Sequence, residues 1–460
     1  YDFSYSHNDK TWVDYEAFNQ ALKNNPTRSV FYDPSVGADP LNPNYADYYN
    51  YGGYVETDGF SSYNPVSIIR GIDDDGRADV FLGSVRATLS LTNKLRLGTF
   101  VSYQTGNEWT GKYWDKTTKY NEGYSRNGIA SHSYKNYQNQ LIENTLQYTD
   151  QIAAHSISGL LGQSYQYNVW SGFSATNTDF ITNLYSYNNL GAGMGVKNND
   201  DRIGMGSYQD SDKLASFFAR AMYNYNQKYY VNASIRMEGS SRFGPQAHPV
   251  LGRYGLFPAI SGSWRMKEES FLRSVKDIND LKIRAGVGVT GNIPGTTNLY
   301  FEKVGPTGNY LWLDGEFIQP WGITSNVNEN LRWEKKTEYN LGIDGEFFNS
   351  KLSATLDGYY RNTTDLLWEY EMPQPPYPFG TMWDNHGQIE NYGVEMAVNG
   401  NVFKNSDWKI DAGIVAAWNR NMVTRITSGY TKGKEGANLP YLNVGYLSGD
   451  GLTGVNIMRL

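Results

Sequence analysis

Residues 337–361 alternate apolar and polar positions on both sides of a short break at Asn349-Ser350. The apolar positions before the break are Tyr339, Leu341, Ile343, Gly345 and Phe347, and those after it are Leu352, Ala354, Leu356, Gly358 and Tyr360. The positions between them include Glu338, Asp344, Glu346, Asp357 and Arg361. Because successive side chains of a strand point to opposite faces, this pattern predicts a β-hairpin with one apolar face and one wet, partly charged face.

The same alternation recurs along the chain, in residues 84–103, 213–238, 281–289, 394–402 and 408–418. It predicts about thirteen strands, the first at residues 1–6, and helical periodicity is weak. Two short helices are expected, at residues 14–24 and 267–275. The fold class is therefore all-β, with antiparallel strands in up-and-down order.

The expected connections alternate in length along the chain. Short turns lie near 92–94, 150–154, 226–228, 348–351 and 403–407, and long loops span about 106–140, 167–212, 239–254, 291–333 and 362–388. The link at 266–280 takes the place of a short turn, although it is longer and is expected to contain a helical turn. In an up-and-down barrel this order gathers short turns at one rim and long loops at the other, as in transmembrane barrels. Long irregular loops are unusual in compact soluble domains.

Strand length agrees with a transmembrane barrel. Trp408 and Trp418 share one face of an apolar strand and are separated by ten positions. At ~3.3 Å per residue they lie ~33 Å apart along the strand. With a tilt of ~40–45° this covers roughly 25 Å of membrane, the height of the apolar band of such barrels. The two tryptophans would then form part of the interfacial girdle. The alternative is a strand of a soluble sheet with two buried tryptophans.

The odd strand number predicts that the chain is part of a larger barrel, because a barrel with unpaired edges does not close. Residues 1–6 (YDFSYS) already resemble the end of a strand, and residues 455–460 (VNIMRL) are followed by no closing strand. We therefore expect both ends to be cuts in a longer polypeptide. No signal peptide is seen at Tyr1.

Composition narrows the class further. Hydrophobic residues make up 39% of the 460 positions, and no run approaches the ~20 apolar residues of a transmembrane helix. There are 38 Tyr, 12 Trp, 19 Phe and 48 Gly, but no Cys, which excludes thiol chemistry and fits an envelope or secreted protein. The net charge of -7 comes without a basic block, so nucleic-acid binding is not expected.

The sequence contains no recognisable set of catalytic residues. The five histidines are scattered singly, and no phosphate loop or nucleophile elbow is present, so we expect no enzyme activity. Asp73, Asp75 and Asp79 follow a D-x-D-G-x-x-D spacing that suits calcium, but the distal Glu of a full loop is absent. A solvated acidic turn leading into the strand at Val80 is the plainer interpretation, and no other cofactor is predicted.

The expected long loops are rich in aromatic residues. Exposed aromatic rings stack on sugar faces or hold peptide side chains, and the alternative is packing between loops or against a partner. The candidates for ligand binding are Trp109, Tyr113, Trp114, Trp312, Trp321, Trp368 and Trp383.

Several stretches together resemble the barrel of the SusC/RagA-type TonB-dependent outer-membrane transporters. They are AFNQALKNNPTRSVFYD (17–33), YNPVSII (63–69), ASIRMEGSSRFG (233–244), FPAISGSWRMKEESFL (257–272), LKIRAGVGVTGN (281–292), LRWEKKTEYNLGIDGEF (331–347), DGYYRNTTDLL (357–367), GQIENYGVEM (387–396) and VNIMRL (455–460). They run in family order and cover residues 1–460 almost throughout.

The resemblance implies a barrel of about 22 strands with a plugged lumen. An N-terminal plug with a TonB box, and further C-terminal strands, would lie outside this sequence. The implied partners are a SusD-like surface lipoprotein, TonB, the lipid bilayer and lipopolysaccharide, with pairs of channel and lipoprotein forming a dimer. The implied activity is import of oligosaccharides or peptides across the outer membrane.

Residue pattern and resemblance then suggest roles for both faces. Arg220, Arg236, Arg284 and Glu338 are expected to line a wet passage, and the apolar positions of 337–361 to face lipid. Two alternatives remain. A secreted, soluble β-rich glycan-binding protein such as a propeller would explain the aromatic content, but it predicts repeats of ~40–50 residues, which are not found. A passive porin would need neither TonB nor a lipoprotein.

Overall fold

A computed structural model of the chain describes residues 1–56, 62–308 and 311–426. These residues divide into two compact units. Unit 1 comprises Tyr1–Val85, Val101–Leu141 and Tyr167–Ser211, and unit 2 comprises Arg86–Phe100, Ile142–Gln166 and the described residues from Asp212 onward. The stretch VNIMRL, at 455–460, lies outside the described residues.

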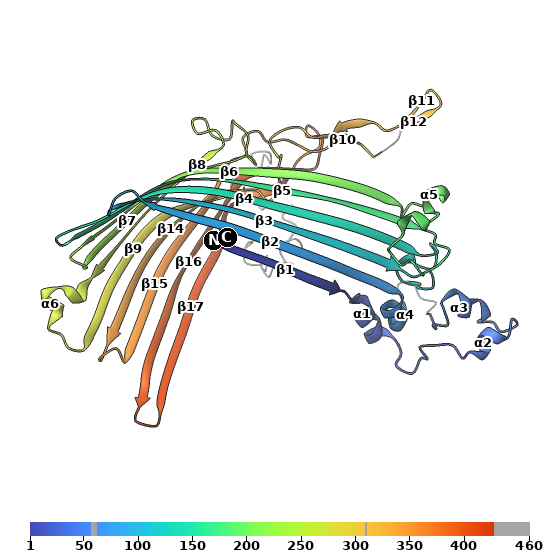
Figure 1. Cartoon of the computed structure of the whole chain (residues 1–460), viewed down its shortest axis with the longest axis horizontal. Coiled ribbons are helices and arrows are strands. Elements are labelled where there is room, and N and C mark those ends of the chain that lie inside the picture. Colours follow the sequence, from blue (N-terminus) through green and yellow to red (C-terminus); the bar gives the residue numbers. More distant parts are fainter. Residues whose placement is uncertain (57–61, 309–310, 427–460) are drawn as a thin grey trace. The chain divides into compact units, whose positions relative to one another are not determined.

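Thirteen long strands form one sheet in which each strand neighbours the next long strand along the chain. They are β1 (Asp2–Thr11), β2 (Ile72–Ser90), β3 (Leu95–Trp114), β4 (Ile129–Ile152), β5 (His155–Thr178), β6 (Gly204–Tyr225), β7 (Tyr229–Ser240), β8 (Tyr254–Arg265), β9 (Ile278–Asn292), β14 (Glu334–Phe347), β15 (Leu352–Glu371), β16 (Thr381–Lys404) and β17 (Lys409–Ile426) (Figure 1). The predicted strand number and the sequential order are confirmed.

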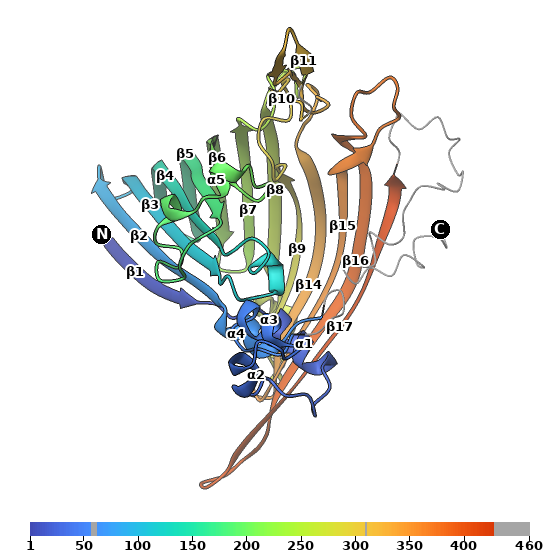
Figure 2. The ribbon, with the colours of Figure 1, turned by 90° about the vertical axis from the view of Figure 1, so that its right-hand side faces the viewer.

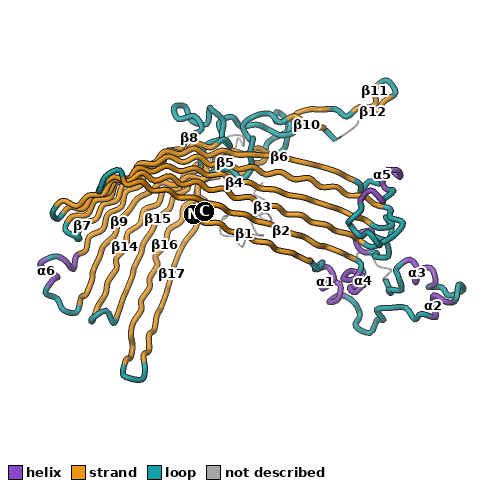
Figure 3. Tube along the Cα trace, viewed as in Figure 1, coloured by secondary structure: helices purple, strands orange, loops and turns teal. Residues whose placement is uncertain are grey.

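The connections alternate in length as predicted, but the long loops are shorter than expected. Short turns join β6 to β7 and β14 to β15, whereas long connections follow β7 and β9 (Figure 3). The predicted loop 106–140 was wrong in extent, because β3 continues to Trp114 and β4 begins at Ile129. The same holds for 362–388, where β15 and β16 occupy all but 372–380. Hydrogen-bonded strands thus continue well beyond the residues whose apolar alternation predicted them.

The hairpin of β14 and β15 has the predicted register. Leu341 pairs with Gly358, Ile343 with Leu356, and the apolar positions meet one another throughout the ladder. Glu338 pairs with Arg361 on the other face. Figure 2 shows β9, β14, β15 and β16 side by side. A one-residue slip would move every apolar side chain to the polar face, so the match of the two patterns fixes the register.

The alternation extends across the strands of unit 2 as rows of paired residues. One apolar row runs Tyr225, Tyr229, Trp264, Ile283, Ile343, Leu356, Met396 and Ala416, from β6 to β17. The adjacent row on the opposite face runs Asn224, Tyr230, Ser263, Arg284, Gly342, Asp357, Glu395 and Ala417. We call the two sides of the sheet the apolar face and the polar face.

Helices and short strands lie in the connections. They are α1 (Glu16–Lys23), α2 (Ser35–Ala38), α3 (Tyr45–Asn50), α4 (Pro65–Arg70), η1 (Tyr120–Glu122), η2 (Leu190–Ala192), α5 (Gly195–Asn198), η3 (Met266–Glu268), α6 (Ser270–Arg273), β10 (Val304–Pro306), β11 (Leu311–Leu313), β12 (Glu316–Ile318) and β13 (Trp321–Ile323). The two helices predicted near 14–24 and 267–275 are confirmed as α1 and as η3 with α6. In the described part of the chain, no helix has the length and apolar character needed to cross a membrane.

Asn64 organises the connection between β1 and β2. Its side chain accepts hydrogen bonds from the backbone N–H groups of Val66 and Ser67 at 3.0 and 3.4 Å, which caps α4, and Pro65 follows at the first helical position. Its amide nitrogen donates to the carbonyls of Val30 and Val55 at 2.8 and 3.2 Å. The stretch YNPVSII therefore joins three parts of this connection.

Two further contacts complete this connection. α1 packs against α4, and the buried Gln20 accepts a hydrogen bond from the backbone N–H of Tyr63 at 3.1 Å. The buried Glu56 accepts one from the backbone N–H of Asn64 at 2.9 Å. Burial raises the pKa of Glu56, although the hydrogen bond from Asn64 opposes this.

Candidate functional site

The four predicted polar-face residues do lie on one face of unit 2. Arg220 on β6 pairs with Ser234, two positions from Arg236 on β7. Arg284 on β9 pairs with Gly342 on β14, four positions from Glu338. Pairing continues from β7 through β8 to β9 with the same alternation. The sequence thus placed these charges correctly, although their role remains a prediction.

Arg284 forms the most connected ion pair of the polar face. Its guanidinium donates to both carboxylate oxygens of Asp344, at 2.7 and 2.9 Å, and to Asp357 Oδ2 at 3.1 Å. On β14, Gly342 lies between Arg284 of β9 and Asp357 of β15. A Cβ atom at Gly342 would come within 2.5 Å of Asp357 and 2.7 Å of Arg284. The glycine therefore leaves the space through which Arg284 crosses β14 to reach Asp357.

Arg236 and Glu338 on this face also have charged partners. Arg236 donates to Ser216 at 2.7 Å and to Glu238 at 2.9 Å. Arg361 lies 3.0 Å from Glu338. Because these paired charges are partly exposed and hold fixed positions, they offer hydrogen-bonding groups to a polar solute.

Arg220 is bound differently. It donates to Asn232 Oδ1 at 3.2 Å and to the sulfur of Met222 at 2.8 Å. Its side chain is exposed, whereas that of Arg236 is half-buried. The polar face therefore contains both charge-paired arginines and one held by neutral neighbours.

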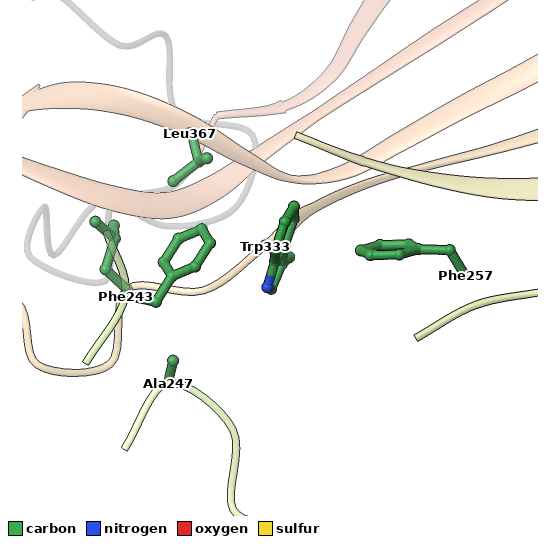
Figure 4. Packing of buried hydrophobic residues seen from close by; sticks show 6 residues of the cluster. Phe243, Ala247, Phe257, Trp333 and Leu367 are labelled. Atoms are coloured by element: carbon green, nitrogen blue, oxygen red, sulfur yellow. The ribbon is translucent and has the colours of Figure 1, made fainter. Parts of the chain in front are cut away.

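A buried aromatic cluster lies on the polar face where the long connections begin. Its members are Phe243, Ala247, Phe257, Leu331, Trp333 and Leu367. Figure 4 shows Trp333 between Phe243 and Phe257, with ring centroids 5.2 Å from each. The indole nitrogen donates to the carbonyl of Arg253 at 3.0 Å. Gly255 and Gly291 give Phe257 room, because a Cβ at either would lie within 2.5 Å of its ring. The cluster ties the connections 241–253 and 293–333 to β8 and β15.

The predicted ligand-binding aromatics of unit 2 divide into exposed and packed residues. Trp312, Trp321 and Trp368 are 63%, 68% and 54% exposed, whereas Trp383 packs against the buried cluster. Trp312 and Trp321 lie in the long connection between β9 and β14, as predicted, within its short strands β11 and β13. The expectation of a loop was wrong for Trp368 and Trp383, which lie on β15 and β16. Trp312 contacts Phe317 edge-on, with ring centroids 4.7 Å apart.

The aromatic candidates of unit 1 lie on β3 and not in a loop. The ring of Tyr113 is 2% exposed and packs with Ala130 and Phe180, so it is a core residue and not an open platform. Its hydroxyl donates to Asn183 at 2.7 Å. Trp114 is partly buried, with the Lys112 ammonium 4.8 Å from its ring centre.

Trp109 belongs to a second aromatic group of unit 1, with His132 and Tyr187 at centroid distances of 4.9 and 5.7 Å. The Tyr187 hydroxyl donates to Asp75 at 2.7 Å. Burial and this hydrogen bond raise the pKa of Tyr187 to about 12, so the hydroxyl stays protonated at neutral pH. Trp109 is half-buried in the group, which leaves part of its surface available for contact.

The acidic stretch 73–79 is part of strand β2 and not a turn, which corrects that expectation. Asp73 accepts a hydrogen bond from Ser186, Asp75 from Thr11 and Asp79 from Tyr5. An extended strand spaces alternate residues ~6–7 Å apart, too far for a loop-like wrap around one ion. Within the described ranges, no group of three acidic or histidine side chains is arranged to hold a metal ion.

Aromatic residues also lie on the apolar face of the sheet, on β17 and next to the short turns. Trp408 and Trp418 are 67% and 58% exposed, and their place in an interfacial girdle stays a prediction. The sequence interpretation missed a second group, Tyr225, Tyr229 and Trp264, whose rings stack in series at centroid distances of 6.3 and 6.5 Å. The available signal was two tyrosines flanking the turn 226–228 on the apolar parity, with Trp264 ending the next run.

Glu269 anchors this aromatic series from the connection between β8 and β9. It accepts hydrogen bonds from the Tyr229 hydroxyl at 2.5 Å and the Trp264 indole at 3.2 Å. The Lys228 ammonium lies 3.4 Å from its other oxygen. Rings with an apolar body and a polar, hydrogen-bonded edge match the boundary between hydrocarbon and water.

Comparison with known proteins places the chain. Residues 3–455 match the family "TonB dependent receptor-like, beta-barrel". The TonB-dependent receptor P3 of Formosa agariphila is 30% identical over 370 residues, covering 80% of this chain and 35% of that protein. The TonB-dependent receptor SusC of Bacteroides thetaiotaomicron is 34% identical over 234 residues, covering 48% of this chain and 22% of that protein.

A solved structure, the RagAB peptide importer in its closed-closed state, shares the fold. Its TM-score is 0.72 at 23% identity, over 82% of this chain and 40% of that one. The chain thus spans well under half the length of these relatives, and its sheet corresponds to part of a larger barrel. The relatives' family comprises outer-membrane transporters and not enzymes. With the family match over almost all of its length, the chain belongs to the TonB-dependent receptor-like β-barrel family.

Proposed function

We propose that this chain is the barrel portion of a SusC-like channel that imports oligosaccharides or peptides across the Gram-negative outer membrane. The observation that carries the proposal is the two-faced sheet of a family member. The row that contains Ile343 and Leu356 stays apolar across the strands, while the adjacent row on the opposite face holds Arg284 and Asp357. In this proposal the apolar face contacts lipid and lipopolysaccharide, and the polar face lines a wet lumen.

The exposed residues at the long connections support capture of a ligand. Trp312, Trp321 and Trp368 present open aromatic surface, which suits stacking on sugars or peptide side chains. A SusD-like surface lipoprotein would close over these connections and hold the ligand against them. Trp109 and Trp114 are secondary candidates because they are partly buried. No covalent step is needed, since binding and release suffice for transport.

Energy for import would come from TonB pulling on a plug that occupies the lumen. Arg220, Arg236, Arg284 and Glu338 would then contact plug, solute and water in turn. Channel and lipoprotein would pair, with two such pairs forming a dimer. On the apolar face, Trp408 and Trp418 would mark the two membrane interfaces, and Tyr225, Tyr229 and Trp264 would mark the one at the short turns.

Uptake by the native bacterium tests this function. We would tag the full protein on the chromosome, isolate the outer membrane, and measure uptake of labelled oligosaccharides and peptides with and without a protonophore. We expect the protein in the membrane fraction with a co-purifying lipoprotein, and uptake that fails without proton-motive force. Uptake that persists after proton-motive force is removed would indicate a passive porin. A detergent-free soluble protein would instead favour a glycan-binding role.

A further inference from the structure

We propose that two neighbouring grooves on the apolar face of unit 2 hold the two hydrocarbon chains of one outer-membrane phospholipid. The inference rests on the proposed membrane location of this face. It goes beyond transport, because it assigns a specific lipid-binding site to the outside of the barrel.

The larger groove has a volume of about 850 Å³. Its floor is made of small residues, Gly159, Ala219, Ala221 and Ala233, where neighbouring positions on the apolar face carry larger side chains. Leu161 and Ile235 rise beside them. The groove therefore results from missing side-chain volume on an otherwise bulky apolar surface.

The second groove, of about 590 Å³, lies immediately beside the first. Gly262, Ala285 and Gly358 form its floor, and Tyr339 and Leu341 rise beside them.

A ridge of two residues separates the grooves. Ile260 and Val287 line both grooves and are directly paired across β8 and β9. Two apolar channels with one narrow ridge between them match a molecule that has two adjacent chains joined at one end.

The chemistry of the lining favours hydrocarbon over a polar ligand. Arg220 lines the larger groove, but its guanidinium is bound to Asn232 and Met222 on the polar side. Sugars or peptides would leave hydrogen-bonding groups unsatisfied against Ala and Gly floors, whereas an acyl chain has none. An acyl chain that lies in the groove makes dispersion contacts along the whole groove. An acyl chain that passes over the groove leaves it empty and loses these contacts, so the first arrangement is favoured.

The aromatic series marks where the polar end of this lipid belongs. Trp264 lies four positions along β8 from Ile260, or ~13 Å at strand spacing. The series of Tyr225, Tyr229 and Trp264, with Glu269 and Lys228 at its polar edge, lies at the short-turn ends of these strands. The phospholipid would thus belong to the leaflet on the short-turn side, with its chains extending from the series into the grooves.

Filling the groove tests the proposal. Ala233→Phe places a ring on the floor of the larger groove. Ala354→Phe is the matched control, because Ala354 lies on the same face opposite Gly345 and lines neither groove. The full protein would be purified from outer membranes in mild detergent and examined by native mass spectrometry. Delipidated samples would then be titrated with phosphatidylethanolamine.

We expect phospholipid adducts on wild type and Ala354→Phe, recovered after delipidation by added phosphatidylethanolamine, and their loss in Ala233→Phe. Equal adducts in all three proteins would overturn the proposal. Adducts of lipopolysaccharide mass, or loss of a dimer without loss of lipid, would overturn it in favour of another occupant. If Ala233→Phe fails to assemble, Ala221→Leu replaces it as a variant that fills the larger groove with a smaller side chain. Uptake and membrane location, measured on the same strains, show separately whether the proposed function holds.

Discussion

Two of the aromatic residues of strand β8, Phe257 and Trp264, lie in opposite environments. Phe257 lies on the polar face and is buried against Trp333, beneath the long connections. Trp264, on the apolar face near the short-turn end, keeps a partly open ring and a hydrogen bond to Glu269. The face and the end of the strand, and not the residue type, decide whether an aromatic side chain forms a core or marks a boundary.

The largest expected effect tests the buried member of this comparison. Trp333→Ala should cost about 3–5 kcal/mol, because it empties the centre of the cluster and removes the hydrogen bond to Arg253. Hydrogen exchange of residues 293–333 would report the loosened connection. Trp264→Ala is the comparison variant, and it should leave that exchange unchanged. Equal protection in wild type and Trp333→Ala would show that the cluster does not hold the connection.

The second test contrasts the two faces of one hairpin. Ile343→Arg puts a charge on the apolar face and should destabilise the barrel by ~2–4 kcal/mol near mid-membrane. Thr355→Arg is the control, because Thr355 pairs with Asp344 on the polar face and the new cation gains an acidic neighbour. Urea unfolding in lipid vesicles measures both. If Ile343→Arg assembles as well as wild type, the apolar face does not contact lipid.

The third test compares two arginines of the polar face, one with acidic partners and one with neutral partners. Arg284→Met removes three charge-assisted hydrogen bonds and leaves Asp344 and Asp357 facing each other, so a loss of about 1–3 kcal/mol is expected. Arg220→Met should cost less, since Arg220 donates to the neutral side chains of Asn232 and Met222. The same unfolding assay compares them. A larger loss for Arg220→Met would reverse our ranking of the two arginines.

The smallest expected effect lies outside both faces, at Glu56. Because burial raises its pKa, the folded segment binds this proton more tightly than the unfolded chain does. The protonated Glu56 therefore stabilises the folded segment. This contribution is fully present below the ordinary glutamate pKa of about 4.3, and it is lost as the pH rises through the raised pKa of the folded state. Glu56→Gln should remove this loss, seen as amide protection around Asn64 that no longer falls with rising pH.

Glu16→Gln provides a control of opposite sign. The hydrogen bond from Gln20 lowers the pKa of Glu16, so its contribution is present at neutral pH and is lost on acidification. If Glu56→Gln and Glu16→Gln change the pH profile in the same direction, burial is not what controls Glu56.

Apolar alternation was sufficient to predict the β14–β15 hairpin, its register and the common face of Arg220, Arg236, Arg284 and Glu338. It did not predict the extensions of β3, β4, β15 and β16. In these extensions apolar and polar residues no longer alternate regularly, so the period-two signal disappears although backbone pairing continues. The burial of Tyr113 was missed for a related reason: it depends on Phe180, which is distant in the sequence.

The hydrogen bonds of Asn64 have a consequence for the order of folding. β1 and β2 pair along ten residues, yet the connection between them is the longest in the described sheet. Closing a loop costs more entropy as the loop grows, whereas β14 and β15 meet after a four-residue turn. By gathering residues 30, 55 and 64–67, Asn64 shortens the effective distance between the two strand ends. β1, early in the chain, is thus expected to join its neighbour late, after its helical connection has condensed.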